Sequence, residues 1–358
     1  MRVERLTLDE WRDALPNSGF EVFHTPEALS VLGSHAAGDL ELYGGFKGQQ
    51  PVGLFPVFVR RRSYGTVVTS PPPFLGARLG PIVMSNSPKQ RKREKLNRRF
   101  TEAVLSALNV TSPKDENGAE SNDLLPDAVR SRITGQTTLF RAACNVDYAD
   151  PRPYVWNGLH ATPQFTYQLD VETPARDDLL MSFSKSLRRE IRDGEELDIS
   201  VETEGVDGAR EIYRDLSRRY DEQGESFGLD WDFVRELVVE LDDRSRVYVT
   251  RGPDGAYISG IIALYSNDAA YFWLGGTRGT YDGVGVNGRL HWRIITDLYE
   301  DDELNSISTY DLHGANNANL CRYKSKFGGT LTEYYVVESS GVEMQLAKGA
   351  YKLISRYR

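Results

Sequence analysis

The chain has 358 residues, of which 40% are hydrophobic and 11% aromatic, enough apolar material for two packed domains. Its net charge of −9 argues against a protein whose whole surface follows a nucleic-acid backbone, and we expect no DNA partner, although a local basic patch could still bind an anion. Because no run approaches the roughly 18 apolar residues of a membrane span and the first residues are charged and amphipathic, we expect a cytoplasmic protein.

The first half of the chain predicts an α/β domain. After an opening strand and helix, Asp39 to Arg62 reads as a β-hairpin with a polar turn at Lys47 to Gln50. Ser70 to Gly80 is rich in proline and glycine and predicts a loop. Pro88 to Leu108 predicts a helix whose first half, KQRKREKLNRR, carries seven basic residues and one acid. That half is either a solvated helix face or an anion-binding face.

Two features indicate how the chain divides. Residues 109–127 have the composition of a flexible surface loop, and the cluster Pro151-Arg152-Pro153 is typical of a domain boundary. We therefore predict one domain over 1–155, a second over 156–340, and a tail helix over 341–358 that could return to the first domain.

The second half predicts strands and helices that resemble those of the first. Gln164 to Val171 alternates like a strand, and Arg246 to Thr277 contains three more. Helices are predicted by apolar periodicity at Asp177–Asp193, Gly208–Tyr220, Asp230–Leu241 with Asp230 as its cap, and Val286–Glu300. Aligning the two hairpins places Gly53 opposite Gly260, which indicates two copies of one α/β unit.

The stretch from Tyr310 to Tyr335 is the most informative part of the chain. It begins as a strand, turns through small residues at 313–315, and continues as a helix with Leu320, Tyr323 and Phe327 at helical spacing. Gly328-Gly329 end this helix, and a second strand follows at 330–337. Near the end of the helix lies a basic pair, Lys324 and Lys326, where we expect the chemistry.

Other kinds of site are less well supported. No G-x-S-x-G elbow precedes a helix, and the five histidines and two cysteines show no metal-ligand spacing, so we expect no bound metal. His291 lies beside apolar residues on a predicted helix and is read as structural, and Cys321 as a small core residue. The loop Gly275 to Gly288 has five glycines before a helix, whose backbone N–H groups could converge on an anion.

Three segments resemble one known family. FSKSLRREIR, YFWLGGT and YDLHGANNANLCRYKSKFGG are similar to the Fem-type peptidyltransferase group of the GNAT acyltransferase superfamily. Its members fuse two GNAT-like domains, and their aromatic-Lys-x-x-Phe-Gly-Gly pattern is matched at residues 323–329. The resemblance implies an α/β fold of tandem GNAT-like domains, each a mixed, mostly antiparallel sheet flanked by helices.

The resemblance also implies roles for particular residues. The family's catalytic lysine falls at Lys324, which would stabilise an oxyanion. Asp311 would orient the incoming amine or accept its proton, or would only cap the following turn. Acyl-CoA binding in this superfamily implies contacts from Gly283, Gly285 and Asn287, although Thr280 stands where the loop pattern has Arg or Gln.

Substrate contacts are implied for two further groups. Arg188, Arg189 and Arg192 would meet phosphates of the donor or of a nucleotide- or lipid-linked acceptor, or would form a solvated helix face. Tyr271 and Trp273 would line the acyl pocket or pack in the core.

The predicted function is N-acyl transfer onto a primary amine of a cell-envelope or glycan precursor. Acyl-CoA is favoured as a co-substrate that is not permanently bound, because the glycine loop is present and the acidic surface disfavours tRNA. The alternatives are aminoacyl transfer from charged tRNA and a non-catalytic scaffold that binds a nucleotide-sugar or a protein. A lipid-linked acceptor would bring peripheral membrane contact. With 10 Lys against 33 Arg and 52 acids, the composition is typical of a salt-rich cytoplasm.

Overall fold

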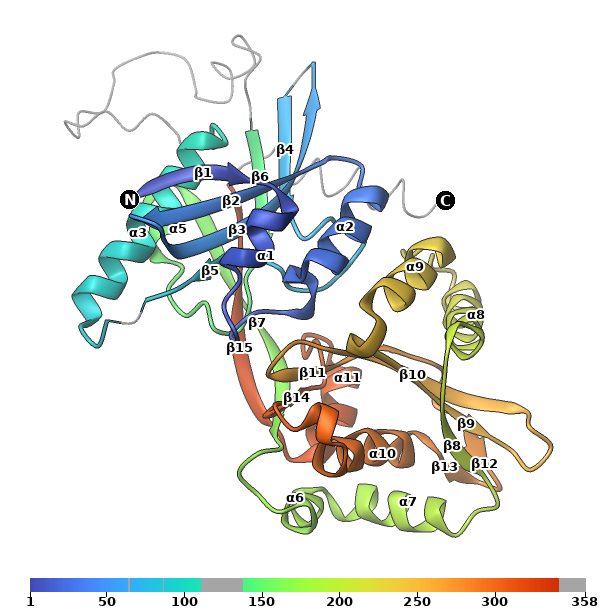
Figure 1. Ribbon diagram of the computed structural model, residues 1–358. Helices are drawn as coiled ribbons and strands as arrows, with labels where there is room; N and C mark the ends of the chain where they lie inside the picture. Colours follow the sequence, from blue (N-terminus) through green and yellow to red (C-terminus); the bar gives the residue numbers. More distant parts are fainter. Residues whose placement is uncertain (64, 86, 111–137, 341–358) are drawn as a thin grey trace. The chain divides into compact units, whose positions relative to one another are not determined.

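The computed structural model describes residues 1–63, 65–85, 87–110 and 138–340 (Figure 1). They form two compact units: unit 1 holds residues 1–16, 32–163 and the described chain from Tyr334 on, and unit 2 holds 17–31 and 164–333. The sequence predicts a domain boundary between residues 155 and 156. In the structure the chain passes from unit 1 to unit 2 after Pro163. Most of the predicted loop 109–127 and the whole predicted tail helix 341–358 lie outside the described residues.

Unit 1 is built on a mixed sheet. The order is β1-β2-β3-β4-β6-β15, in which only β4 and β6 run parallel, and the short β5 pairs with β3. The strands are β1 (Arg2–Leu6), β2 (Asp39–Lys47), β3 (Gln50–Arg62), β4 (Gly65–Ser70), β5 (Ile82–Val83), β6 (Thr138–Ala143) and β15 (Thr330–Ser339). The helices are α1 (Leu8–Ala14), α3 (Gln90–Ala107), α5 (Arg152–Trp156) and the end of α2 (Pro26–His35).

Unit 2 repeats this plan. The order is β8-β9-β10-β11-β14-β7, in which only β11 and β14 run parallel. The strands are β7 (Leu159–Asp170), β8 (Ser200–Glu204), β9 (Ser245–Arg251), β10 (Tyr257–Tyr265), β11 (Ala269–Gly275) and β14 (Thr309–Asp311), with a separate pair β12 (Thr280–Tyr281) and β13 (Val284–Gly285). The helices are α6 (Arg176–Ser182), α7 (Lys185–Glu195), α8 (Val206–Glu222), α9 (Trp231–Leu241), α10 (Asn287–Glu300) and α11 (Ala318–Lys324).

The predicted fold class and internal repeat are confirmed by these two strand orders. Each has four antiparallel strands, then one parallel pair, then an antiparallel last strand. Gly53 and Gly260 lie in the corresponding strands β3 and β10, as predicted. A Cβ at Gly53 would lie 2.8 Å from the Phe100 ring, and one at Gly260 would lie 2.6 Å from the Ile212 side chain. Each glycine therefore lets a helix side chain pack directly on its sheet.

The last strands are exchanged between the repeats. The chain leaves β6 through α5 and enters β7, which pairs with β14 of unit 2. The chain then leaves β14 through α11 and enters β15, which pairs with β6 of unit 1. The sheet of each unit is consequently completed by a strand from the other repeat.

The single helix predicted over 177–193 is wrong, because it is two helices. Phe183 has an extended ψ of 152° at the end of α6, and the Ser184 side chain accepts the Leu187 N–H at the start of α7. Serine favours a cap over a helix interior, because its hydroxyl competes for backbone hydrogen bonds. The predicted cap of α9 is also wrong in detail, since Asp230 is at the N-cap position but its side chain makes no capping hydrogen bond.

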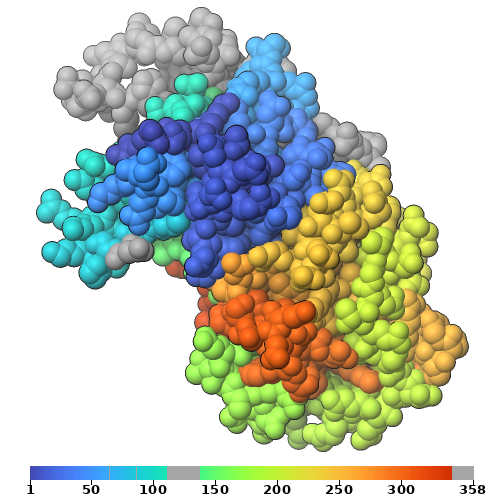
Figure 2. Space-filling model, in the orientation of Figure 1, coloured from blue at the N-terminus to red at the C-terminus, as the bar shows by residue number. Residues whose placement is uncertain are grey.

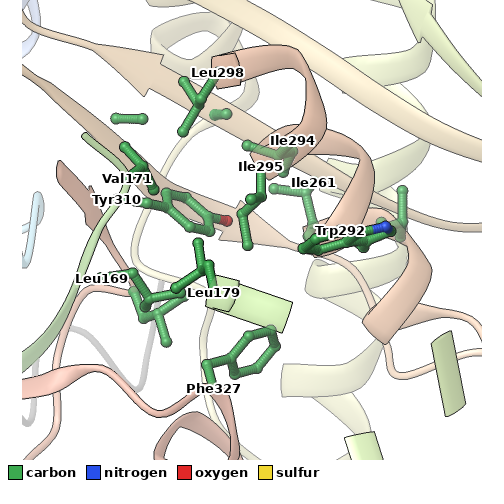
Figure 3. Close-up of a cluster of buried hydrophobic side chains, with 14 of the residues drawn as sticks. Leu169, Val171, Leu179, Ile261, Trp292, Ile294, Ile295, Leu298, Tyr310 and Phe327 are labelled. Atoms are coloured by element: carbon green, nitrogen blue, oxygen red, sulfur yellow. The ribbon is translucent and has the colours of Figure 1, made fainter. Parts of the chain in front are cut away.

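The core of unit 2 lies between α10 and its sheet. Figure 3 shows Ile294, Ile295 and Leu298 of α10 facing Tyr310 of β14. Phe327 closes the cluster at its other end, with its ring centroid 5.5 Å from that of Phe183. The site described below is attached to this core. Among the helices that the structure describes, none is long and apolar enough to span a membrane.

Candidate active site

The strands β11 and β14 separate after three residue pairs. They pair in parallel from Ala269–Thr309 to Tyr271–Asp311 and no further. On β11, Trp273 is an extra residue in the ladder with β10, and such a bulge bends its strand. On the other side, β14 ends at a turn in which His313 and Gly314 have φ of 56° and 59°. The two strands thus leave an opening between their carboxyl ends.

Lys324 fills this opening. Its Nζ donates to the His313 carbonyl and, at 2.9 Å, to the Gly314 carbonyl. Nζ also lies 5.6 Å from the centroid of the Phe272 ring on β11, a cation–π distance. Only 6% of Lys324 is exposed. The residue is the last of α11, whose start is capped by the Asn317 side chain. A buried cation is therefore held at a fixed point where the sheet opens.

Asp311 holds the turn that holds Lys324. Its fully buried carboxylate accepts the Thr166 hydroxyl at 2.5 Å and the His313 N–H at 2.7 Å on one oxygen, and the Gln168 amide at 3.4 Å on the other. Of the two roles predicted for Asp311, the structure shows the contacts of the turn cap. Asp311 is thus positioned to act on the site through the His313 backbone.

Aromatic side chains surround the cation on the α10 side. The His291 ring centroid lies 4.7 Å from that of Phe272 and 4.8 Å from that of Phe327, and its Nδ1 is 2.8 Å from the Tyr310 hydroxyl. Burial lowers the pKa of His291 to about 3, and the positive charges of Lys324 and Arg278 add to the effect. His291 is therefore neutral at physiological pH, which agrees with the structural role predicted for it.

Among the aromatic side chains around Lys324, two buried polar atoms have no hydrogen-bond partner within the described part of the chain. They are Nε2 of His291 and the hydroxyl of Tyr323. The guanidinium of Arg278 lies 4.0 Å from the Tyr323 ring centroid, so a second cation borders the same region. Burial raises the pKa of Tyr323, which stays protonated and can donate a hydrogen bond.

Within the predicted glycine loop, residues 280–285 form a short β-hairpin. Asp282 and Gly283 have φ of 47° and 79° between β12 and β13, the signs that a two-residue type I′ turn requires. Gly283 is at the tip, and a Cβ there would meet nothing within 4 Å. Asn287 begins α10 and is buried, with its Oδ1 lacking a hydrogen-bond partner in the described residues.

A carboxylate of the protein itself occupies the start of α10. Oε1 of Glu190, on α7, accepts the Gly288 N–H at 3.1 Å. A Cβ added to Gly285 or to Gly288 would come within 3.0 Å or 3.1 Å of the same oxygen. The two glycines therefore allow Glu190 to approach the helix terminus, where the macrodipole favours a negative charge. The position predicted for an external anion holds an internal one.

The three predicted arginines of α7 make local contacts or face solvent. Nη1 of Arg188 donates to the Met181 carbonyl at 2.7 Å, and Arg189 pairs with Asp193 at 3.2 Å. Arg192 is exposed and makes no ion pair within the described ranges. The inner side of α7, with Leu187 and Ile191 buried, packs on α10. The arginine helix and the glycine hairpin thus meet through Glu190, and the arginines themselves stay at the surface.

Tyr271 and Trp273 lie away from Lys324. The Tyr271 hydroxyl is 3.3 Å from the Ser266 hydroxyl, and the Trp273 ring centroid lies 6.3 Å from those of both Phe23 and Phe233. Both side chains pack within unit 2, and the binding role predicted for them stays a prediction. The residue of β11 that contacts the cation is Phe272, which sequence reasoning passed over.

A shallow groove of about 350 Å³ opens beside the end of α11. It is lined by Gln168, Leu169, Asp170, Thr173, Pro174, Leu179, Gly328, Gly329 and Thr330. No residue predicted for catalysis or binding lines this groove, although Gln168 links it to Asp311.

The Phe-Gly-Gly end of the motif has a packing explanation. Gly328 has a φ of 69°, and a Cβ there would lie 2.7 Å from the Ser182 carbonyl oxygen. A Cβ on Gly329 would lie 2.8 Å from the Gln168 carbonyl oxygen. The two glycines let the chain pass close to α6 and β7, and this passage places α11 so that Lys324 reaches the opening.

Comparison with known proteins gives one family match. Residues 181–325 match the acetyltransferase (GNAT) domain, a segment that contains β11, α10, β14 and Lys324. No curated protein sequence matches the chain.

Solved structures share the fold over nearly the whole chain. FemX aligns with a TM-score of 0.66 at 12% identity, over 99% of this chain and 100% of FemX. The C-terminal domain of a putative lysylphosphatidylglycerol synthetase from Agrobacterium fabrum aligns with a TM-score of 0.52 at 13% identity, over 95% of this chain and 94% of that domain. L-PGS from Bacillus licheniformis aligns with a TM-score of 0.53 at 11% identity, over 98% of this chain and 96% of L-PGS. At these identities the likeness is one of fold.

Proposed function

We propose that this chain, whose residues 181–325 match the acetyltransferase (GNAT) domain and which shares the fold of FemX, transfers an acyl group from an aminoacyl ester to a primary amine. The observation that carries the proposal is the buried ammonium of Lys324, held between Phe272 and two carbonyls where β11 and β14 separate. Acyl transfer is accelerated by a fixed hydrogen-bond donor or positive charge that stabilises the oxyanion, and a non-catalytic scaffold has no use for such a group.

The chemistry follows from the charge that develops in the reaction. The amine nitrogen attacks the ester carbonyl, and the tetrahedral intermediate carries a negative oxygen. The Lys324 ammonium stabilises this oxygen in surroundings where water is excluded and charge interactions are strong. The N–C bond forms, the C–O bond breaks, and the amine proton leaves with the ester oxygen. Asp311 contributes as a positioning residue, through the turn that fixes the Lys324 contacts.

Glu190 supports an ester donor over acyl-CoA. An acyl-CoA pyrophosphate at the start of α10 would meet the carboxylate that already accepts the Gly288 N–H. Two anions at one helix terminus repel each other, so CoA would have to displace Glu190. An aminoacyl-tRNA presents its ester without that pyrophosphate. Acyl-CoA is the second candidate donor, favoured by the hairpin and helix that follow β11.

The acceptor in this proposal is a primary amine of a cell-envelope or glycan precursor, small or lipid-linked, met on the cytoplasmic side. The support is the chemistry of the site, since a neutral amine can approach the cation at Lys324 and a protonated amine is repelled by it.

The test is a transfer assay with tRNA that carries a radiolabelled amino acid and a panel of amino sugars and lysine-containing peptides. We expect the label to move to an amine acceptor, and Lys324→Met to lower kcat about 100-fold to 1000-fold, the usual effect of removing one oxyanion donor. Lys326→Met is the matched control, because it removes the same charge two residues further on and the Lys326 side chain makes no hydrogen bond or ion pair with another described residue.

Equal transfer by wild type and Lys324→Met would refute the catalytic role. Transfer from acetyl-CoA but not from charged tRNA would replace the ester donor with the thioester. A folded wild-type protein that transfers from neither donor would favour the scaffold function.

A further inference from the structure

The first half of α3 carries an exposed basic surface that the proposed function does not use. Seven basic residues and one acid lie between positions 89 and 99, in a chain with a net charge of −9. All seven are exposed, and Figure 2 shows this part of the chain, in cyan, at the surface. We call these residues the α3 basic face: Lys89, Arg91, Lys92, Arg93, Lys95, Arg98 and Arg99.

This arrangement does not serve the stability of the helix. Cations in the first turn oppose the helix macrodipole, and α3 has no acid there and no side-chain cap at Lys89. None of the residues from Gln90 to Leu96 is buried. The helix is held by its second half, where Phe100 packs on Gly45 and Gly53. The helix terminus and the side chains therefore combine into one region of positive potential.

Most of these cations have no acidic partner in the described chain. Arg98 lies 3.6 Å from Glu102, and Arg93 donates to the Ser87 carbonyl and the Gln90 amide oxygen. The remaining five form no ion pair with any described residue: Lys89, Arg91, Lys92, Lys95 and Arg99. The single acid, Glu94, is bound by Arg152 of α5 at 2.7 Å. An external anion would therefore find the charge of this face available.

Exposed apolar side chains lie next to the α3 basic face. Helix α5 packs on α3, and the Asn97 amide donates to the Asp150 carbonyl at 2.8 Å. The guanidinium of Arg152, which binds Glu94, lies 5.6 Å from the Trp156 ring centroid. Trp156 is 46% exposed and its neighbour Val155 is 48% exposed. Arg152 thus connects the cations of α3 to an adjoining apolar pair.

We propose that the α3 basic face, together with Val155 and Trp156, docks on an anionic lipid bilayer. Unpaired Lys and Arg side chains are attracted to acidic headgroups, and an exposed tryptophan partitions into the interface between headgroups and hydrocarbon. An RNA backbone would also meet the cations, and its bases could stack on Trp156. Val155 distinguishes the two, because an exposed aliphatic side chain gains from lipid and has no partner on a phosphate backbone.

The test is sedimentation of the full-length protein with vesicles of phosphatidylcholine, with or without phosphatidylglycerol, at low salt. We expect binding only to the anionic vesicles. Each cation near an anionic surface strengthens binding about fivefold, so Arg91→Gln with Lys95→Gln should weaken it about 25-fold. Val155→Ser should weaken it roughly fivefold through the lost apolar contact.

The matched control is Arg214→Gln with Arg235→Gln, which removes the same charge from exposed positions on α8 and α9. We expect this variant to bind anionic vesicles like wild type. The proposal would be overturned if the double variant Arg91→Gln with Lys95→Gln bound anionic vesicles as well as wild type does. It would also be overturned if the wild-type protein did not sediment with anionic vesicles but bound deacylated tRNA through Arg91 and Lys95. Circular dichroism should show all variants folded, because glutamine is close to Lys and Arg in helix propensity.

Discussion

Glu190→Ala tests whether the start of α10 is filled by the protein itself. The carboxylate accepts the Gly288 N–H at 3.1 Å and lies at the positive end of the helix. Alanine removes both the acceptor and the charge. The substitution leaves the Gly288 N–H at the start of α10 without this acceptor. An oxyanion of a ligand could then take the place of the carboxylate.

The expected loss of stability combines two contributions. A hydrogen bond to a charged acceptor contributes about 1.5 kcal/mol, and the interaction with the helix dipole about 0.5 kcal/mol more at a half-buried position. The sum of about 2 kcal/mol corresponds to a fall in Tm of roughly 4 to 8 °C for a unit of this size. Glu190→Gln keeps an acceptor oxygen and should lose only the dipole contribution. Glu196→Ala, at the exposed end of α7, is the control and should leave Tm unchanged.

The ligand response is the decisive measurement. Acetyl-CoA should leave the Tm of wild type unchanged and should raise that of Glu190→Ala, because a ligand present at 100 times its Kd stabilises the folded state by about 2.7 kcal/mol. Inorganic pyrophosphate should also raise the Tm of Glu190→Ala, since it carries the phosphoanhydride oxyanions that acetyl-CoA would place at the helix start. If acetyl-CoA raises the Tm of wild type as much as that of the variant, Glu190 does not keep other anions from the start of α10. The argument for an ester donor over acyl-CoA would then fail.

Two further predictions concern His291, which packs beside Lys324, and the glycines Gly328 and Gly283. Because burial lowers the pKa of His291 to about 3, the unfolded chain binds a proton that the folded chain does not bind between about pH 6.5 and pH 3. Stability should therefore fall as pH drops through that window, by at most about 1.4 kcal/mol per pH unit, and urea unfolding should show a shallower pH dependence for His291→Gln than for wild type. Gly328→Ala should cost about 2 kcal/mol or more, because φ is 69° and the new Cβ would meet the Ser182 carbonyl at 2.7 Å. Gly283→Ala has a similar φ of 79° but open space, so its loss should stay near 1 kcal/mol; equal losses for the two variants in urea unfolding would exclude the steric argument.

Local sequence patterns were sufficient to predict the secondary-structure elements next to the site. The hairpin predicted over 39–62 is β2 and β3 with the predicted turn, and the helix predicted over 286–300 is α10. The helical spacing of Tyr323 and Phe327 predicted the helical segment that begins with α11, and the glycine pair 328–329 predicted where this segment ends. These features depend on neighbours in sequence, which periodicity and turn chemistry describe directly.

What the sequence did not reveal depends on partners far along the chain. Glu190 binds Gly288, 98 residues away, and the sequence emphasises the three arginines around it. A signal was present, because Glu190 lies between Leu187 and Ile191 on the face of α7 that these apolar residues bury. Likewise, nothing in β7 or β15 alone indicates that each completes the sheet of the other repeat. Pairing of distant strands is decided by packing of the whole unit, which a local pattern cannot contain.

The buried ammonium itself argues for catalysis over a silent scaffold. Removing a lysine charge from water is costly, and the fold bears this cost while it holds the ammonium against two carbonyls and an aromatic ring. Methionine or leucine at position 324 would pack against Phe272 and spare that cost, so a fold that needed only the Phe-Gly-Gly passage would gain nothing from lysine there. The left-handed conformation of His313, which is strained for a residue other than glycine, and the buried carboxylate of Asp311 both serve to hold the same cation. Three destabilising features that converge on one positive charge are explained by a reaction in which negative charge develops beside it.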